Sequence, residues 1–344
     1  MEKITIKEIA KICQVGIGTV SRAINNGADI SQETREKILK VIEEKGYIPN
    51  NSARNLKRSE TKTIAVLVKG MSNPFFGNMI RDMGDEIRKK KFTMVLHHIE
   101  FEEDEVEVAL ELIKEKRLRG IIFLGGYFKG KENRLIKIPI PYVLSTVGGI
   151  PEHLDKTKYS SVGVWDVQES YKAVEYLIKA GHRKIAIFTS DESKEGIGLL
   201  RLEGYKNALT KYKIKINPRL IRNMKEEIEY YSMENGFAMM QELLQDKEEF
   251  TAVYAIADTL AIGAMKALSL SGKKIPEDYS VVGFDGIDMG KYFIPSLTTL
   301  SQPMEKISSE TTKLLFQVIM GKEVHKHCIL EGSLIIRDSS RTVL

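Results

Sequence analysis

The sequence contains little cysteine and no long apolar segment. Its two cysteines, Cys13 and Cys328, are too few for a disulfide framework in 344 residues and are typical of a reducing compartment. No run of about 18 apolar residues is present, so we expect no transmembrane helix. The first residues, MEKITIKEIAKICQ, are charged and amphipathic and lack the apolar stretch of a signal peptide. These absences predict a cytoplasmic protein that makes no contact with a membrane.

Residues that could carry catalysis or hold a metal are also scarce. No Ser/His/Asp set, carboxylate pair or GxGxxG motif suggests an active site. The segment Gly125–Lys131 fits the phosphate-loop pattern GxxxxGK, but Glu132 stands where Ser or Thr would bind Mg²⁺. His97–His98 would point to opposite faces of a strand, and HKHC at 325–328 is more typical of a turn leading into a strand. We therefore expect no enzyme, no cofactor and no bound metal.

Positive charge is modest in total and concentrated near the N-terminus. The net charge is +5, and residues 1–60 hold eleven Lys or Arg against eight Asp or Glu. A basic N-terminal segment is typical of a protein that binds a polyanion there.

The first 46 residues have the pattern of three short helices. Thr5 and Glu8 form a capping box at the start of the first helix. The second helix lies within GIGTVSRAIN, and the third begins at the N-cap Ser31 and ends at Gly46. Residues 47–62 are polar and basic, and they predict a linker with at most a short helix.

The second helix is unusual because its first turn contains two glycines. A glycine inside a helix costs about 1 kcal/mol relative to alanine. Val20 and Ala23 lie on one side of the helix, and Gly18 and Arg22 on the other. Paired with the first helix it predicts a helix-turn-helix, in which Gly18 lets the backbone approach a groove and Arg22 contacts guanine or phosphate. The alternatives are an ordinary surface helix and, for Ile17, a place in the core instead of a contact with a thymine methyl.

From Thr63 onward, strands alternate with helices. TIAVLV and GIIFLG in the first half, and KIAIFT, AVYAIA and SVVGFD in the second, are separated by amphipathic stretches. This rhythm is typical of βαβ units with parallel sheets, and two sets of units predict two lobes with a boundary near Trp165. We expect one lobe to comprise residues 63–164 plus 291–322 and the other residues 165–290 plus 323–344.

The motifs follow one another in an order shared with a known family. The series TIKEIAKICQVGIGTVSRAIN, NNSARNLKR, GHRKIAIF, RLEGYKNAL, ADTLAIGAMKAL and IPEDYSVVGFDGID covers essentially the whole chain. It resembles the lac repressor (LacI/GalR) family of bacterial transcription regulators. The resemblance implies an all-α helix-turn-helix headpiece at 1–46, a hinge helix at 47–62, and a two-lobed α/β core at 63–344. That core would be similar to periplasmic binding proteins, with parallel sheets flanked by helices.

The resemblance also implies which residues contact DNA. Family members bind pseudo-palindromic operators as dimers, with one recognition helix per half-site in the major groove. At the matching positions, Ile17, Gly18 and Arg22 would read bases. Backbone-contacting positions are occupied by Thr5, Gly16, Thr19, Ser21, Asn25, Ser31 and Arg35. Gly16 replaces the serine that the family uses for a phosphate contact.

The segment NNSARNLKR matches the hinge helix of the family, which enters the minor groove. Leu56 lies where the family inserts a leucine between the central base pairs and kinks the duplex. Judged without the family, Leu56 would be an isolated apolar residue of a loop. The residues that would line the groove or contact phosphate are Asn50, Ala53, Arg54 and Lys57.

A small-molecule site is expected in the crevice between the lobes, at the C-terminal ends of the strands. Asn73–Pro74 opens a helix whose first turn carries Phe75 and Phe76, and we expect one ring to face a sugar and the other the core. Asp258 and Asp285 each end an apolar run, and a carboxylate can accept sugar hydroxyls. The alternatives are a helix N-cap at Asp258, which we favour, and a turn at Asp285.

Arg201 and Trp165 complete the expected effector site. Arg201 could donate to a ligand or pair with a neighbour on a helix surface. The resemblance favours effector contacts by Arg201, Asp285 and both phenylalanines. The sequence departs from the family in having Ala257 where an asparagine is usual and Trp165 in a segment that usually reads Val-Asp-Asn. An indole there suggests a flatter, stacked site for a disaccharide or glycoside, with a place in the core as the alternative.

The sequence thus predicts a sequence-specific DNA-binding transcription regulator, and repression is the usual mode in this family. We expect a homodimer on operator DNA whose affinity is controlled by a small-molecule effector, a sugar or glycoside. The chain ends at RDSSRTVL without leucine heptads, so no tetramerising coiled coil is expected. The alternatives are a corepressor-dependent regulator of the same family and a solute-binding protein without a DNA function.

Overall fold

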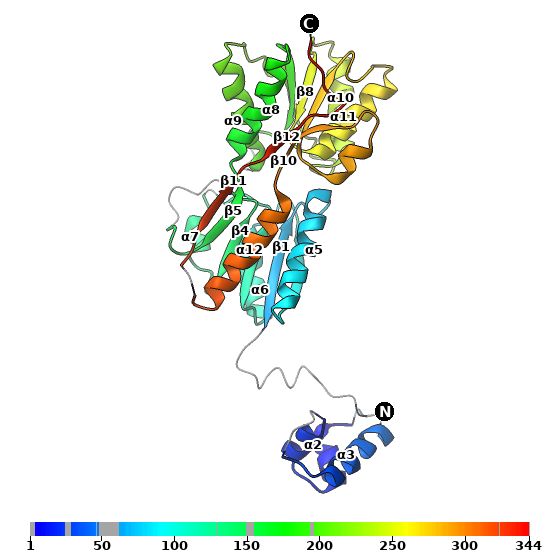
Figure 1. Ribbon diagram of the computed structural model, residues 1–344, viewed down its shortest axis with the longest axis vertical. Helices are drawn as coiled ribbons and strands as arrows, with labels where there is room; N and C mark the ends of the chain where they lie inside the picture. Colours follow the sequence, from blue (N-terminus) through cyan, green and yellow to red (C-terminus); the bar gives the residue numbers. More distant parts are fainter. Residues whose placement is uncertain are drawn as a thin grey trace. The chain divides into compact units, whose positions relative to one another are not determined.

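The computed structural model consists of two compact units, Met1–Thr61 and Lys62–Leu344 (Figure 1). The residues that it describes are 4–24, 29–45, 47, 62–128, 130–148, 155–192, 196–322 and 324–343. No helix in these ranges is both long enough and apolar enough to span a membrane.

The first unit contains the three predicted helices, α1 (Ile6–Cys13), α2 (Ile17–Ile24) and α3 (Gln32–Glu44). The capping box at the start of α1 is confirmed, since Thr5 accepts from the backbone N–H of Glu8 and the Glu8 carboxylate accepts from Thr5. Ser31 caps α3 as predicted. The side chains that form the small core are Ile9, Ala10, Cys13, Val20, Ala23 and Ile38. The three helices therefore bury one common apolar face.

The first lobe of the second unit is built on a parallel six-stranded sheet in the order β11-β5-β4-β3-β1-β2. Its strands are β1 (Thr63–Lys69), β2 (Thr93–Ile99), β3 (Gly120–Leu124), β4 (Tyr142–Ser145), β5 (Ser160–Val164) and β11 (His327–Leu330). Its helices are α5 (Pro74–Lys89), α6 (Glu105–Glu115), α7 (Glu132–Leu135) and α12 (Met304–Ile319). Although α12 comes late in the chain, it packs beside α5 (Figure 1).

The second lobe contains a sheet in the order β12-β10-β9-β8-β6-β7, parallel except for β12, which pairs antiparallel with β10. Its strands are β6 (Ile185–Thr189), β7 (Ile221–Asn223), β8 (Ala252–Ala255), β9 (Ser280–Asp285), β10 (Thr298–Ser301) and β12 (Ser333–Ile335). Its helices are α8 (Asp166–Lys179), α9 (Ile197–Lys211), α10 (Met233–Gln245) and α11 (Asp258–Leu270), with 3₁₀ turns η1 (Pro218–Leu220) and η2 (Asp288–Tyr292).

The chain passes between the two sheets three times, and two of the crossings differ from the predicted boundaries. The first crossing lies at Trp165, between β5 and α8, as expected. The second lies after β10, which pairs with β9, so residues 291–301 belong with the second lobe and not the first. The third lies after β11, which pairs with β5, so the segment before Glu331 belongs with the first lobe. Strand pairing decides membership, and a hydrophobic run does not reveal its partner strand.

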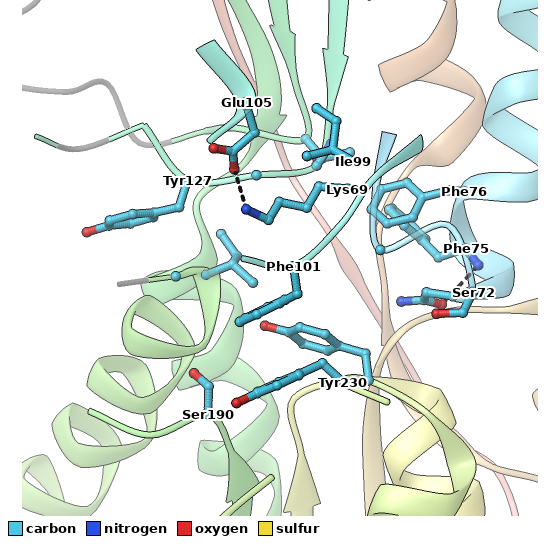
Figure 2. Close-up of a pocket in the computed structure, with 18 of the residues that line it drawn as sticks. Lys69, Ser72, Phe75, Phe76, Ile99, Phe101, Glu105, Tyr127, Ser190 and Tyr230 are labelled. Carbon is cyan, nitrogen blue, oxygen red and sulfur yellow. Dashed lines mark hydrogen bonds and ion pairs between the residues drawn. The ribbon is translucent and has the colours of Figure 1, made fainter. Parts of the chain in front are cut away.

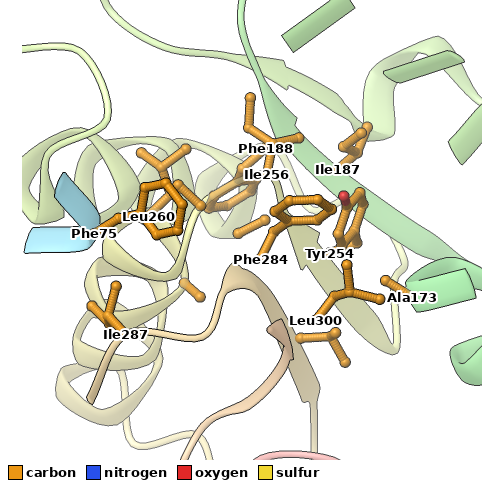
Figure 3. Close-up of a cluster of buried hydrophobic side chains, with 14 of the residues drawn as sticks. Phe75, Ala173, Ile187, Phe188, Tyr254, Ile256, Leu260, Phe284, Ile287 and Leu300 are labelled. Atoms are coloured by element: carbon orange, nitrogen blue, oxygen red, sulfur yellow. The ribbon is translucent and has the colours of Figure 1, made fainter. Parts of the chain in front are cut away.

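The core of the second lobe is rich in aromatic side chains. Phe188, Tyr254 and Phe284 are fully buried, from β6, β8 and β9 (Figure 3). Phe75, which belongs to α5 of the first lobe, reaches the same buried cluster beside Leu260 (Figure 3). An apolar contact therefore joins the two lobes.

Candidate DNA-binding and effector sites

The surface of α2 has the composition that the sequence predicted. Val20 and Ala23 are buried, whereas Gly18 and Arg22 are exposed. Ile17 is 45% exposed, so the alternative that placed it in the core is wrong. The Arg22 Nε atom donates to the carbonyl of Gly18 at 3.3 Å, which lays the guanidinium along the exposed side of the helix. The exposed side of α2 therefore presents the apolar side chain of Ile17, the backbone at Gly18, which has no side chain, and the cationic side chain of Arg22.

Three of the residues at backbone-contacting positions also shape the ends of these helices. The carbonyl of Gly16 accepts the first hydrogen bonds of α2, and Thr5 and Ser31 are exposed caps. Thr19, Ser21 and Arg35 are half-buried. The other predicted DNA contacts lie outside the described residues: Asn25, Asn50, Ala53, Arg54, Leu56 and Lys57.

The second unit contains a cavity of about 240 Å³ that residues of both lobes line (Figure 2). Lys69 and Ile99 line it from the ends of β1 and β2, and Asp285 lines it from the end of β9. The expectation that a crevice opens at the C-terminal ends of the strands is therefore confirmed. We call this cavity the cleft.

Arg201 is buried at the second-lobe side of the cleft, so the alternative of a surface ion pair is wrong. Its Nε atom donates to Asp166 Oδ1 at 2.9 Å, and its Nη1 atom lies 3.5 Å from Asp285 Oδ1. The guanidinium carbon lies 3.8 Å from the centre of the Phe284 ring. Burial raises the pKa of both carboxyl groups, and the Arg201 guanidinium opposes this shift. The Arg201 guanidinium thus pairs with two buried acidic groups.

Asp285 also connects the lobes. Its carboxylate accepts from Asn73 Nδ2 at 3.0 Å and from Gln302 Nε2 at 2.9 Å, and Asn73 belongs to the first lobe. Asp285 and Gly286 both have positive φ angles, of 121° and 80°, at the point where β9 ends. Asp285 therefore lines the cleft, ends β9 and makes a hydrogen bond to the first lobe.

Phe75 and Phe76 both line the cleft and are both buried, at 2% and 9% exposure. The rings meet edge to face, with centroids 5.2 Å apart. Asn73 caps α5 by accepting from the N–H of Phe75, and Pro74 follows at the first helical position, as predicted. Instead of one ring of each kind, both rings combine core packing with a place in the lining.

Comparison with known proteins gives two family matches. Residues 5–50 match the model of bacterial regulatory proteins of the lacI family, and residues 174–340 match a periplasmic binding protein-like domain. The chain is 41% identical over 336 residues to the transcriptional regulator MalR of Clostridium butyricum, covering 97% of this chain and 98% of the relative. The chain belongs to the LacI family. This LacI-family protein is a DNA-binding transcriptional regulator, and the alternative of a solute-binding protein without a DNA function is not supported.

Two other relatives of this LacI-family regulator have a sugar in their name or in their structure. The ribose operon repressor of Haemophilus influenzae is 32% identical, covering 97% of this chain and 98% of the relative. The structure of the regulator CelR in complex with cellobiose superposes with a TM-score of 0.70 at 28% identity, covering 98% of this chain and all of that one.

Two residues predicted for the effector site of this LacI-family regulator lie elsewhere. Asp258 is fully buried outside the cleft lining, and its carboxyl group accepts from the N–H groups of Gly286 and Ile287, each at 2.8 Å, and from the Thr299 hydroxyl at 2.6 Å. It does not cap α11, because Ala257 precedes that helix as its N-cap. Asp258 instead binds the backbone immediately after Asp285, and Asp285 lines the cleft.

Trp165 is the other correction. It precedes α8 at the first crossing between the lobes, and it is 55% exposed and outside the cleft lining. Neither the stacking role nor the alternative of a core residue agrees with this position. Trp165 lies where the chain leaves β5 and enters α8, and the spacing of apolar residues in the sequence does not reveal whether such a position is covered.

Several lining residues of the LacI-family cleft were not predicted from the sequence. Lys69 could have been found by the strand-end rule, because it ends TIAVLVK. Lys131 lies in the segment discounted as a phosphate loop, and Phe101, Ser190 and Tyr230 follow strands or sit in loops without a motif. Among the described residues no three His, Cys, Asp or Glu side chains are placed to hold a metal ion.

Proposed function

We propose that this LacI-family regulator represses transcription as a homodimer on a pseudo-palindromic operator, and that a sugar in the cleft releases it. The observation that carries the effector proposal is the buried Arg201–Asp285 pair beside the Phe75 and Phe76 rings. A guanidinium donates to hydroxyls, a carboxylate accepts from them, and ring faces suit the C–H side of a sugar.

The operator contacts are proposed for the exposed side of α2. Ile17 would touch thymine methyl groups, Gly18 would let the helix approach the groove, and Arg22 would be the main direct reader of bases. With little hydrogen-bonding capacity at positions 17 and 18, part of the specificity would come from the shape of the duplex. Leu56 would act as the wedge at the central base step.

The sugar class is proposed from the cleft and from the relatives together. The CelR structure contains cellobiose, and the Haemophilus relative is named for ribose. The buried acidic and basic groups of this cleft match the mixed donors and acceptors of a neutral polyol.

The switch would be a shift between two placements of the lobes. The hydrogen bond from Asn73 to Asp285 joins the lobes at the ligand position, and a sugar that engages Asp285 would compete with it. The lobe placement would then set whether the two hinge segments of a dimer can pair in the minor groove.

The test is selection of bound duplexes from a randomised pool by the full-length protein, with and without a panel of mono- and disaccharides and nucleobases. We expect a pseudo-palindrome with a flexible central step that one sugar releases. Enrichment only in the presence of a ligand would make the protein a corepressor-dependent regulator. No enriched sequence under any condition would contradict the operator proposal.

A further inference from the structure

Two aromatic rings, one from each lobe, stack on each other in the lining of the cleft. Phe101 follows β2 of the first lobe, and Tyr230 lies between β7 and α10 of the second. The ring centroids are 4.0 Å apart and the ring planes are 2° from parallel. Figure 2 shows both rings beside Lys69. Because the rings belong to different lobes, this contact exists only while the lobes lie close together at this point.

The stack lies at the edge of the sheets opposite the crossings between the lobes. The crossings involve the strands at one edge of each sheet, β11 and β5 in the first lobe and β12 and β10 in the second. The strands β2 and β7, which lead to Phe101 and Tyr230, are the last strands at the other edge. A hinge movement about the crossings separates these far edges most. The stack therefore lies where the cleft would open.

The loop that carries Phe101 is fixed to the first lobe. Lys69 Nζ donates to the carbonyl of Glu103 at 2.8 Å and lies 5.6 Å from the Phe101 centroid. The Glu103 carboxylate in turn accepts from the backbone N–H of Glu100 at 2.8 Å. Lys69 is itself paired with the buried Glu105 at 3.2 Å. A chain of polar contacts thus connects the Phe101 loop to the end of β1.

The loop that carries Tyr230 is fixed to the second lobe in a similar way. Asn235, a fully buried residue of α10, accepts from the N–H of Lys225 at 2.8 Å and donates to the Lys225 carbonyl at 3.0 Å. The buried hydroxyl of Thr259 donates to the carbonyl of Tyr231. Rings presented by fixed loops lose little conformational freedom when they stack, so the contact can favour one placement of the lobes over another.

We infer that Phe101 and Tyr230 form an aromatic clasp, which closes the mouth of the cleft and parts each time an effector enters or leaves. The inference rests on the proposed effector switch, to which it adds a barrier on access. A stacked pair changes an equilibrium constant about three- to tenfold, so the clasp favours the closed cleft and still opens reversibly. It slows binding and release together, and so it sets how fast the regulator responds.

The test measures access to the cleft without any effector. Ser190→Cys places a thiol in the lining, at a position that is 4% exposed. Its alkylation by iodoacetamide in the full-length protein is followed by mass spectrometry of the peptide that contains residue 190. Phe101→Leu, which keeps an apolar side chain but cannot stack, should speed this alkylation about three- to tenfold. Phe101→Tyr should keep the slow rate, as should the control Tyr212→Ala, which truncates a ring outside the lining.

A cycle of single and double substitutions shows whether the two rings act through each other. Tyr230→Leu should speed the alkylation as much as Phe101→Leu does. The combined variant should be no faster than either one, because both substitutions break the same contact. Rates that multiply in the combined variant would show that each ring limits access separately, and this would overturn the inference. A natural alkylation rate in Phe101→Leu would overturn it as well.

The clasp and the sugar effector can fail independently. If the substitutions open the cleft but none of the mono- and disaccharides binds, the clasp stands and the sugar effector is wrong. Suppose instead that a sugar binds and leaves the natural protein and Phe101→Leu with the same association and dissociation rates. The clasp is then wrong, and the sugar proposal stands.

Discussion

Asp166 and Asp285 share one buried cation, the guanidinium of Arg201, and this decides how the site can be tested. Arg201→Ala would leave two buried carboxyl groups without their partner, and breaking such a buried pair costs about 3–5 kcal/mol. A lost ligand response in that variant would therefore also report damage to the second lobe. A cleaner probe is a polar side chain that the unliganded fold does not use.

Ser190 is such a side chain. Its hydroxyl is buried in the cleft lining and has no hydrogen-bond partner among the residues that the structure describes. We predict that Ser190→Ala weakens effector binding about three- to tenfold, the value of one neutral hydrogen bond, and leaves the melting temperature unchanged. Calorimetry and thermal unfolding measure the two effects, with the exposed Ser309→Ala as control. A variant that binds the effector normally would remove Ser190 from the site.

Asp258 makes the stability of the core depend on pH. Burial, with a smaller contribution from Asp285, raises its pKa from 3.8 to about 8. Between these values the folded protein holds a proton that the unfolded chain releases, so this contribution to stability is full below about pH 4 and is lost as the pH rises towards 8. Asp258→Asn keeps an acceptor for the two N–H groups and does not titrate.

We therefore predict that the urea midpoint of the natural protein falls more between pH 6 and pH 8 than that of Asp258→Asn. Asp258→Ala should be strongly destabilised at both pH values, because it leaves the buried N–H of Ile287 and the half-buried N–H of Gly286 without an acceptor. Parallel pH profiles for the natural protein and Asp258→Asn would mean that Asp258 is ionised in the folded core.

At the scale of elements, a substitution on α2 can change the stability of the headpiece and its affinity for the operator in opposite directions. Among the described residues, the nearest atom to a Cβ atom on Gly18 would be Nη2 of Arg22, at 4.0 Å, so the described part of the headpiece does not require glycine there. We predict that Gly18→Ala stabilises the headpiece by about 1 kcal/mol and weakens operator binding, because the added methyl group lies on the side that faces the groove. Hydrogen exchange of the headpiece amides and titration of the selected duplex measure the two effects.

Gly77→Ala is the matched control for this substitution. Gly77 lies in α5, is exposed, and an added Cβ there would have no atom of the described residues within 4 Å. It should stabilise its own helix in the same way and leave operator affinity unchanged. If Gly18→Ala binds the operator as well as the natural protein, Gly18 does not lie against the groove.

The elements also show what could be learned from the sequence. The headpiece helices were predictable because Thr5, Glu8 and Ser31 act on neighbours three residues away. The lobe to which β10 and β11 belong was not predictable. β10 pairs with β9 and β11 pairs with β5, and the sequence contains several similar apolar runs that could have been the partner strand. In the cleft, Asp285 was found because it ends an apolar run and Arg201 was favoured by family position, whereas the Phe101–Tyr230 stack joins residues from different lobes and has no local pattern.

At the scale of the whole molecule, one segment of the second unit carries three exposed apolar side chains. Met289, Tyr292 and Ile294 lie within or just after η2 and are 42%, 77% and 99% exposed. Exposed apolar side chains that cluster in one segment are typical of an interface. A pseudo-palindromic operator needs two headpieces held together, so we propose that a second copy of this chain covers the segment in a symmetric contact.

Ile294→Asp should therefore shift the protein from dimer to monomer at micromolar concentration, measured by sedimentation equilibrium. Operator affinity should fall together with dimerisation, because two linked headpieces bind two half-sites far more tightly than separate ones do. Ile136→Asp places the same charge on an exposed isoleucine of the first lobe and should change neither quantity. If Ile294→Asp remains a dimer with full operator affinity, the dimer contact lies on another surface, and the segment after η2 serves a different partner.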